Sequence, residues 1–445
     1  MNFIYTLTIL YALLIFGLSF VRYKLAIVLY LSYLILVPYL SIGPLSYSSI
    51  NAVLLGSLIY NLRFKKKKIS LNYVAVKPFI FLVACMLIVA LLSDLFNPYL
   101  QMYMLFSDFM RVCVFSFIIW NVSINDEKFV KNSKWSLIVS VIIAGLYAIS
   151  IIRLGGENPY TSLLSSHLNI DNSDMVTFLE DEDRIRNAGT MFEPFTWVFF
   201  LSGFCVLFLT CFFIERKRLY LLLLCFVVFN IIIAGVRTGI VASCVSLAYI
   251  YIRYSGFRIK TLLYGAVIVL VLGFIVASNE GLSNLFVSLI DVRGTKTEVK
   301  GSSLEMRMNQ FEGCLNEISD SPLFGNGYLW TNHYLSEKGD HPVLLGFESL
   351  IFVVLCNFGI AGVVFWSAFA FMLYKVPRKI LKIKKNIYFV DGMVIFFFTF
   401  ILITGLFPEW LAYFALFYSF LLGYLYNEEK KIIIRKENNN LLIYK

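Results

Sequence analysis

The chain of 445 residues is 59% hydrophobic and 15% charged, whereas soluble globular proteins are roughly 45–50% apolar and about 25% charged. This composition excludes a disordered chain, a collagen and a disulfide-rich secreted domain, and it argues against an ordinary soluble enzyme. Membrane spans need about 20 apolar residues each, so the chain could supply roughly a dozen. We therefore expect an all-α polytopic membrane protein with about 12–13 transmembrane helices.

Apolar runs bounded by charged or turn residues predict thirteen spans. They are expected near residues 3–20, 25–40, 44–62, 77–93, 104–121, 135–152, 194–214, 219–235, 238–252, 261–278, 346–374, 387–407 and 410–426. The run at 346–374 is long enough to be tilted or to extend beyond the bilayer. The chain thus divides into N-terminal spans (1–152), central spans (194–278), C-terminal spans (346–426) and a basic tail (427–445).

Lys and Arg accumulate in alternate connections, including the run from Lys65 to Lys68 and the tail after Lys430. Because basic residues are enriched on the cytoplasmic side, this asymmetry predicts an outer N-terminus and a cytoplasmic C-terminus. The net charge of +10 is then cytoplasmic charge near anionic lipid, and no nucleic-acid partner is needed. Two large connections, 153–193 and 279–345, are expected to form folded caps on the outer side.

Cysteines and acidic residues give no sign of a metal site. Seven of the eight cysteines lie in apolar runs, only Cys314 lies in a polar segment, and no Cys-x-x-Cys pattern occurs, so we expect no disulfide framework. The run from Glu180 to Asp183 contains an Asp-x-Asp pattern that holds a metal in nucleotide-sugar glycosyltransferases. An outer loop meets no nucleotide pool, so we interpret this run as a solvated acidic loop.

Arg237 lies in Ala-Gly-Val-Arg-Thr-Gly, at an expected tight turn on the outer side. Its fork of N–H donors matches phosphate geometry and keeps its charge at any working pH. The alternative is an arginine whose side chain reaches the outer headgroups. An outer arginine runs against the enrichment of basic residues on the cytoplasmic side, so we favour anion binding.

Arg186 and Arg307 are also expected on the outer side, and each alone would suit a surface ion pair. If the three converge, they could hold a diphosphate.

Glu348 is expected one turn into the span at 346–374, where burial would make it a candidate general base. The alternative is a helix N-terminal acid that the helix dipole favours. Arg111 follows Asp108 by three residues, so an ion pair within the helix explains it adequately. His341 is interpreted as a polar loop residue.

Four segments of the chain resemble the O-antigen ligase and polymerase superfamily, which comprises bacterial enzymes that handle lipid-linked sugars outside the inner membrane. The segments are Arg186-Asn-Ala-Gly-Thr-Met-Phe-Glu-Pro, Ala234-Gly-Val-Arg-Thr-Gly-Ile, Arg307 through Asp320-Ser-Pro-Leu-Phe-Gly-Asn-Gly, and Glu348-Ser-Leu-Ile through Asn357-Phe-Gly-Ile-Ala-Gly. Ligases of the superfamily usually place a His-Asn pair about eleven residues before the Gly-Ile of the last segment. Here Glu348 and Ser349 occupy those positions and His341 lies seven residues earlier. This departure favours a polymerase and leaves both Glu348 and His341 open as the base.

The resemblance implies a GT-C-like, inverting, metal-independent glycosyltransferase that needs no cofactor. Its donor would be a glycan on undecaprenyl diphosphate, and its acceptor another lipid-linked repeat unit of an O-antigen, capsule or exopolysaccharide. Glu348, Arg237 and Arg186 are the catalytic candidates. Candidates for contact with the diphosphate or glycan are Arg307, Arg111, His341 and Glu193.

The same resemblance implies an inner-membrane location with a periplasmic active site, a lipid environment, and a flippase and a chain-length regulator as partners. Two alternatives stay open. One is a ligase that transfers finished glycan to a lipid A core or a protein, and the other is a flippase or transporter for the same lipid-linked sugar.

Overall fold

The computed structural model describes residues 3–37, 54, 56, 72–93, 97–153, 158–159, 180–181, 184–185, 187–191, 193–256, 304–406 and 408–443. Apart from Leu54 and Gly56, the predicted spans at 44–62 and 261–278 lie outside these residues.

The described part is an all-α polytopic membrane protein, as predicted. Its helices are α1 (Phe3–Val21), α2 (Tyr23–Leu36), α4 (Lys77–Leu92), α5 (Pro98–Asp108), α6 (Phe115–Asn125), α7 (Glu127–Arg153), α10 (Pro194–Glu215), α11 (Arg218–Ile233), α12 (Arg237–Ser255), α15 (Leu304–Glu317), α16 (Trp330–Lys338), α17 (Leu350–Ile380), α18 (Lys384–Thr404) and α19 (Pro408–Ile443). A π-helix, Phe109–Val114, joins α5 to α6. Two residues of the acidic run form β1 (Glu180–Asp181), which pairs antiparallel with β2 (Arg184–Ile185); we call these two strands the hairpin.

Within the described residues, five helical segments are long and apolar enough to cross a membrane: Pro98–Asn125, Glu127–Ile152, Pro194–Glu215, Leu350–Ile380 and Lys384–Thr404. Three shorter apolar helices, α2, α4 and α11, accompany them. Each predicted span within the described residues coincides with a helix, including the short run at 238–252, which lies in α12.

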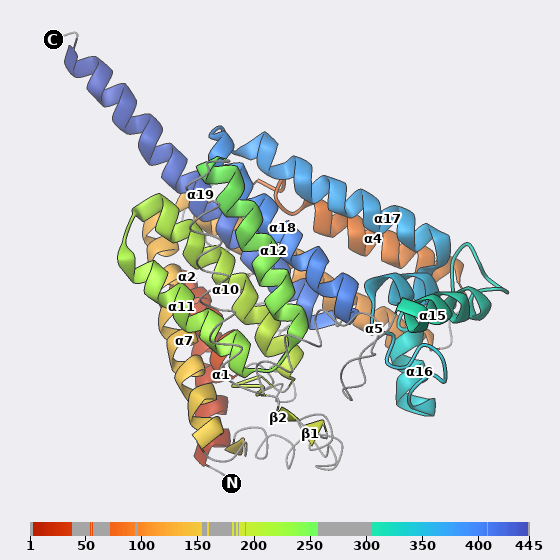
Figure 1. The fold of residues 1–445 in the computed structure, drawn as a ribbon. Helices are drawn as coiled ribbons and strands as arrows, with labels where there is room; N and C mark the ends of the chain where they lie inside the picture. Colours follow the sequence, from red (N-terminus) through yellow and green to blue (C-terminus); the bar gives the residue numbers. More distant parts are fainter. Residues whose placement is uncertain are drawn as a thin grey trace.

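Helix α10 is the centre of the bundle and packs against α11, α12, α18 and α19 (Figure 1). It is apolar on all sides, as expected of a helix buried by neighbours all round. Phe199 stacks on Trp410 of α19 with ring centroids 5.6 Å apart, and Phe400 of α18 packs edge-on at 5.1 Å. Such aromatic pairs contribute roughly 0.5–1.5 kcal/mol each beyond the area they bury.

Contacts between α10 and α12 show that the two helices run in the same direction. Gly239 lies against Val198, and one turn further along both helices Ser243 Oγ donates a hydrogen bond to Ser202 Oγ at 2.8 Å. Both helices therefore begin at the same end of the bundle.

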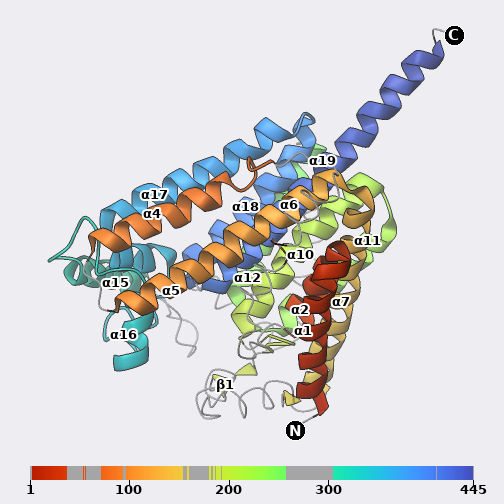
Figure 2. The ribbon, with the colours of Figure 1, turned by 180° about the vertical axis from the view of Figure 1, so that it is seen from behind.

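Helix α18 runs antiparallel to α12, since Ser246 Oγ donates to Gly392 O at 2.7 Å while Lys385 lies over the ring of Tyr254. The C-terminal end of α18 therefore lies beside the beginnings of α10 and α12. We call this end of the bundle the loop end. The hairpin, α15 and α16 lie on this side of the bundle (Figures 1 and 2).

At the opposite end, which we call the tail end, α19 continues past the body of the bundle (Figure 1). The predicted span at 410–426 and the predicted basic tail thus share one helix that runs to Ile443.

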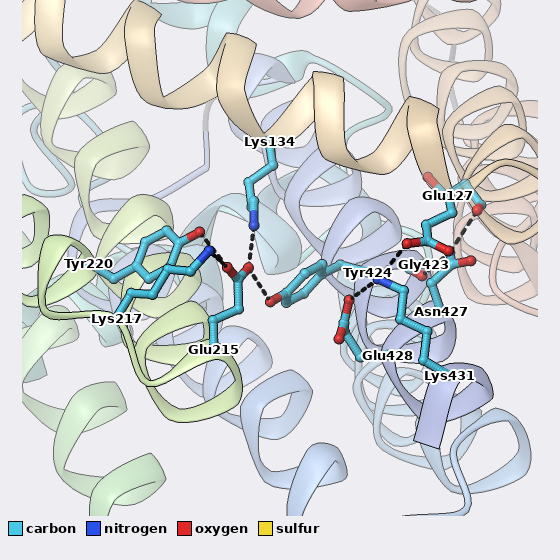
Figure 3. A network of polar contacts seen from close by, with 11 residues as sticks. Glu127, Lys134, Glu215, Lys217, Tyr220, Gly423, Tyr424, Asn427, Glu428 and Lys431 are labelled. Carbon is cyan, nitrogen blue, oxygen red and sulfur yellow. Dashed lines mark hydrogen bonds and ion pairs between the residues drawn. The ribbon is translucent and has the colours of Figure 1, made fainter. Parts of the chain in front are cut away.

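The tail end is tied together by charged side chains (Figure 3). Lys134 of α7 forms an ion pair with Glu215, the last residue of α10. The hydroxyls of Tyr220 and Tyr424 donate to the same carboxylate at 2.9 Å and 3.0 Å, and Lys217 pairs with it at 3.1 Å. One carboxylate thereby joins α7, α10, α11 and α19.

Candidate functional site

Arg237 is the first residue of α12 and lies at the loop end. The preceding turn contains Gly235 with a φ of 72°, a left-handed conformation that glycine adopts without strain. A Cβ atom at Gly239 would lie 1.7 Å from Val198, so only glycine lets the first turn of α12 press this closely on α10. The half-buried guanidinium of Arg237 therefore shares a helix N-terminus with backbone N–H groups, an arrangement that favours anions.

Glu193 immediately precedes α10 and is half-buried. Pro194 opens the helix, where its missing N–H costs nothing. Thr196 Oγ1 donates to Glu193 Oε2 at 3.3 Å and accepts a hydrogen bond from Trp410 Nε1 at 2.8 Å. The start of α19 thus helps to position this carboxylate beside the start of α10.

Glu348 is exposed and lies before α17, so the expectation of a buried carboxylate one turn into the helix is wrong. The reason is Ser349, the N-cap of α17, whose Oγ accepts from Ile351 N at 3.3 Å and donates to Leu402 O at 2.9 Å. The helix consequently begins after Ser349, and Glu348 remains in the connection that leads to it.

The backbone just before Glu348 is constrained. Leu345 and Phe347 have φ values of 51° and 55°, which are uncommon for residues with a side chain. Gly405, directly after α18, packs so closely that a Cβ there would lie 2.9 Å from Phe347 O. This contact fixes the Glu348 segment to the C-terminal end of α18 at the loop end.

His341 uses both ring nitrogens within the cap. Its Nδ1 accepts hydrogen bonds from the backbone N–H groups of Val343 and Leu344 at 3.1 Å and 2.9 Å. Since Nδ1 is an acceptor, the ring proton of the neutral form lies on Nε2, 3.1 Å from Glu317 Oε1. The buried imidazole therefore shapes the turn before α17 and has no vacant lone pair with which to act as a base.

A turn at residues 322–327, which we call the Pro-Gly turn, inserts into a break in α17. At Gly359 the helix adopts a φ of 59° and a ψ of −152°, so its regular hydrogen-bond ladder is interrupted. Four backbone hydrogen bonds to the Pro-Gly turn replace the missing ones: Asn326 N to Cys356 O (2.8 Å), Gly327 N to Asn357 O (3.1 Å), Ile360 N to Pro322 O (3.0 Å) and Ala361 N to Leu323 O (3.0 Å). Because buried backbone N–H and C=O groups need hydrogen-bond partners, this exchange makes the break tolerable.

Two glycines permit this close approach. A Cβ at Gly325 would lie 2.6 Å from Gly359 N, and one at Gly359 would lie 2.6 Å from Pro322 O. Both glycines also have positive φ values, of 69° and 59°. The Pro-x-x-Gly-x-Gly and Asn-Phe-Gly-Ile segments are thus two halves of one interlocked structure.

Arg111 lies within the π-helix and is half-buried, and its Nε donates to Ser107 Oγ at 3.0 Å. Asp108, which sequence reasoning paired with Arg111, accepts a hydrogen bond from the hydroxyl of Tyr328. The buried Gln101 donates to Tyr328 O at 2.7 Å. These bonds attach α5 to the residue that follows the Pro-Gly turn. The π-helix continues directly from α5, and π-helical turns occur frequently at functional sites.

Sequence reasoning missed Gln101, Tyr328 and Asn357. Asn357 Oδ1 accepts from Thr331 N at 2.9 Å and so orients the start of α16. The polar Gln101 amid apolar residues and the tyrosine directly after Gly327 were the available signals.

The structure brings Arg237, Glu193 and Glu348 to the loop end, at the beginnings of three different helices. Arg186 lies outside the described residues. The segment after it docks at the loop end, where Asn187 Nδ2 donates to Ala148 O at 2.6 Å. Arg307 lies in the first turn of α15, which confirms the expected helix there.

Residues 220–367 match the family model described as O-antigen ligase. The matched segment runs from α11 to α17 and includes Arg237, the Pro-Gly turn, His341 and Glu348. A comparison with curated proteins finds no match.

Proposed function

We propose that this chain, whose residues 220–367 match the family model described as O-antigen ligase, polymerises undecaprenyl-diphosphate-linked oligosaccharide units at its loop end. The loop end faces the periplasm in this proposal. The acceptor hydroxyl of one unit attacks the anomeric carbon of the donor glycan with inversion, and Glu348 takes the proton of that hydroxyl. The bond to the diphosphate breaks, and Arg186, Arg237 and Arg307 neutralise the charge on the departing diphosphate.

One observation carries the proposal: Arg237 is the first residue of α12, Glu348 lies just before α17, and both positions are at the loop end, the side of the bundle on which α15 and α16 lie (Figure 1). Glu193 lies there as well, and it is proposed to bind the glycan. The N-terminal ends of α10, α12 and α17 add partial positive charge where a diphosphate would depart. An exposed carboxylate at Glu348 is accessible to an acceptor hydroxyl.

His341 supports the choice of Glu348 as the base. Both imidazole nitrogens have partners inside the cap, and Nδ1 accepts two backbone hydrogen bonds. Glu348 lies at the surface of the loop end, where an acceptor hydroxyl can approach it. Glu348 and Ser349 also stand where ligases of the superfamily usually have a His-Asn pair, which favours the polymerase over the ligase.

The test is elongation of synthetic undecaprenyl-diphosphate repeat units by the purified protein. Glu348→Gln should lower the elongation rate at least about 100-fold, in line with the usual contribution of general acid–base catalysis, and Glu348→Asp should restore part of it. The matched control is Glu312→Gln, at an exposed position on α15. Wild-type elongation by Glu348→Gln would remove Glu348 from the mechanism.

A deletion strain separates the polymerase from its two alternatives. Loss of a polymerase leaves single repeat units on the final acceptor, whereas loss of a ligase leaves finished polymer on the carrier lipid. Loss of a flippase leaves lipid-linked units on the cytoplasmic leaflet. Only the first pattern agrees with the proposal. Expression of the wild-type chain or of the Glu312→Gln variant in the deletion strain should restore polymer.

A further inference from the structure

A cysteine of the cap faces a cysteine of α17 across the contact between α15 and α17. Cys314 of α15 and Cys356 of α17 are 42 residues apart in sequence, yet their Sγ atoms lie 3.4 Å apart. Both side chains are fully buried, and both are free thiols in this structure. A disulfide needs a separation of about 2.05 Å, so a movement of roughly 1.4 Å would join them.

Their surroundings are a small apolar core between α15 and the first part of α17. It consists of Cys314, Ile318, Leu344, Phe347, Phe352, Val353, Leu355 and Cys356. Small cores bury too little apolar surface to hold their elements firmly, and extracellular modules commonly compensate with disulfides. A covalent bond between Cys314 and Cys356 would reinforce this core.

The basic-inside asymmetry of the chain predicts that α15 lies on the outer side of the membrane and that the N-terminal end of α17 faces this side, where disulfides persist. No local pattern indicates that these residues pair, because Cys314 lies in a polar segment and Cys356 in an apolar one. The fold supplies the reason by packing the two segments together.

We propose that Cys314 and Cys356 form a structural disulfide in the protein as it matures outside the cytoplasm. Two S–H bonds break and one S–S bond forms, so the two thiols give up two protons and two electrons. By thiol–disulfide exchange through a mixed disulfide, the electrons pass to the disulfide of an oxidised dithiol–disulfide oxidoreductase, which is left as a dithiol. The exchange takes place before α15 packs against α17, because both sulfur atoms are buried afterwards.

The disulfide would link α15 of the cap covalently to the part of α17 that precedes the break at Gly359. Cys356 O accepts the hydrogen bond from Asn326 N, so the disulfide would lie directly beside the Pro-Gly turn. Asn326 Nδ2 in turn donates to Glu317 O at the end of α15. The disulfide therefore fixes three connected elements, and it does so independently of any glycosyl transfer.

The experiment counts reduced and oxidised cysteines in the full-length chain from intact cells. Cells are quenched in acid, and the denatured protein is treated with light N-ethylmaleimide, reduced, and then treated with the heavy reagent. Mass spectrometry of the peptides should find the heavy label on Cys314 and Cys356. Cys113 and Cys211, which are buried in the bundle, should carry the light label as internal controls.

Two further measurements complete the test. In the Cys314→Ser variant, Cys356 should be a free thiol and carry the light label. In the wild type, omission of the reducing step should yield one cross-linked species that contains both cysteines. Reduction should lower the thermal unfolding midpoint of the wild type, while a Cys314→Ala/Cys356→Ala variant should show no such response. Light label on both cysteines of the wild type, or a bond from either one to another cysteine, would overturn the proposal.

Discussion

The two ends of the helix bundle use polar side chains in different ways. At the tail end, oppositely charged residues pair across helices, as Lys134 does with Glu215 and Arg378 with Asp391. At the loop end, uncharged side chains bond to backbone carbonyls at helix ends. Examples are Gln101 to Tyr328 O, Asn187 to Ala148 O, Thr190 to Ile35 O and Ser349 to Leu402 O.

This difference indicates how a membrane protein can separate structure from chemistry. Ion pairs at the tail end hold helices together, and in each pair the positive and the negative charge neutralise each other. Neutral side chains perform much of the structural bonding at the loop end, so charged residues placed there can be selected for a ligand. We therefore expect charge removal to cost stability at the tail end and activity at the loop end.

The largest effect is expected for Arg378→Ala at the tail end. Arg378 donates to both carboxylate oxygens of Asp391, at 2.8 Å and 2.7 Å, and Asp391 is only 3% exposed. Breaking a buried pair leaves one charge uncompensated, so the free energy of unfolding should fall by about 3–5 kcal/mol. Thermal unfolding in detergent measures the loss, and elongation per folded molecule should not change.

Two variants serve as controls for Arg378→Ala. Lys379→Ala removes a charge from the exposed neighbouring residue and should change stability little. Arg378→Lys keeps the charge without the two-pronged geometry and should lie in between. A stability loss below about 1 kcal/mol, the range of exposed ion pairs, would show that the tail-end pairs are not the structural ties inferred here.

Arg237→Ala is the corresponding change at the loop end. If Arg237 stabilises the departing diphosphate, its removal should slow elongation by about 10²–10³-fold, as loss of one preorganised donor does in other enzymes. Arg237→Lys should recover part of the rate, because a point charge replaces the fork. Single-turnover elongation and thermal unfolding are measured on the same preparation. An unfolding midpoint lowered as far as that of Arg378→Ala would make Arg237 a structural residue and break the comparison.

A third change tests the interlocked turn that shapes the loop end. Gly359→Ala places a Cβ 2.6 Å from Pro322 O in a left-handed conformation, which should cost about 2–3 kcal/mol of stability from strain and steric overlap. Gly346→Ala is the matched control, since a Cβ there has no neighbour within 4 Å. Thermal unfolding compares the two variants. Equal midpoints would indicate that the Pro-Gly turn is not held against α17 as tightly as the backbone bonds imply.

Composition and apolar run length were sufficient to predict the fold class and, within the described residues, where the apolar helices lie. A helix in a membrane needs a long apolar run, and such runs are visible in a single sequence. The tight turn before Arg237 and the helix around Arg307 were also predicted, because glycines and an amphipathic pattern signal them locally. Arg186 lies outside the described residues, so its role stays a prediction.

What could not be predicted depends on residues far apart in the chain. The proline and glycines at 322–327 predict a turn, but nothing local shows that it inserts into a helix more than thirty residues later. The exposure of Glu348 likewise depends on Ser349, whose hydroxyl reaches both Ile351 N and Leu402 O. Long-range partners of this kind decide where a helix begins or breaks.

The smallest expected effect concerns a tail-end ion pair and its dependence on pH. Partial burial alone would raise the pKa of the Asp126 carboxyl, but hydrogen bonds from Lys24 and from the backbone N–H of Phe129 outweigh burial and lower this pKa. A lowered folded-state pKa means that the stabilisation is present above the unfolded value of about 3.9 and is lost as the pH falls through the folded value. Because Lys24 is 39% exposed, the pair should contribute only about 0.2–1 kcal/mol.

Asp126→Asn isolates this contribution, since the amide oxygen can still accept from Phe129 N at the start of α7 while the charge is gone. Unfolding midpoints of the wild type and the variant should differ slightly near pH 7 and converge as the medium is acidified below about pH 3.9, the unfolded value. A difference that grows on acidification would have the wrong sign for a charged, stabilising Asp126. The Lys24–Asp126 pair would then not stabilise the folded state, because its contribution must disappear when the Asp126 carboxylate is protonated. Only the more buried ion pairs would remain as structural contacts of the tail end.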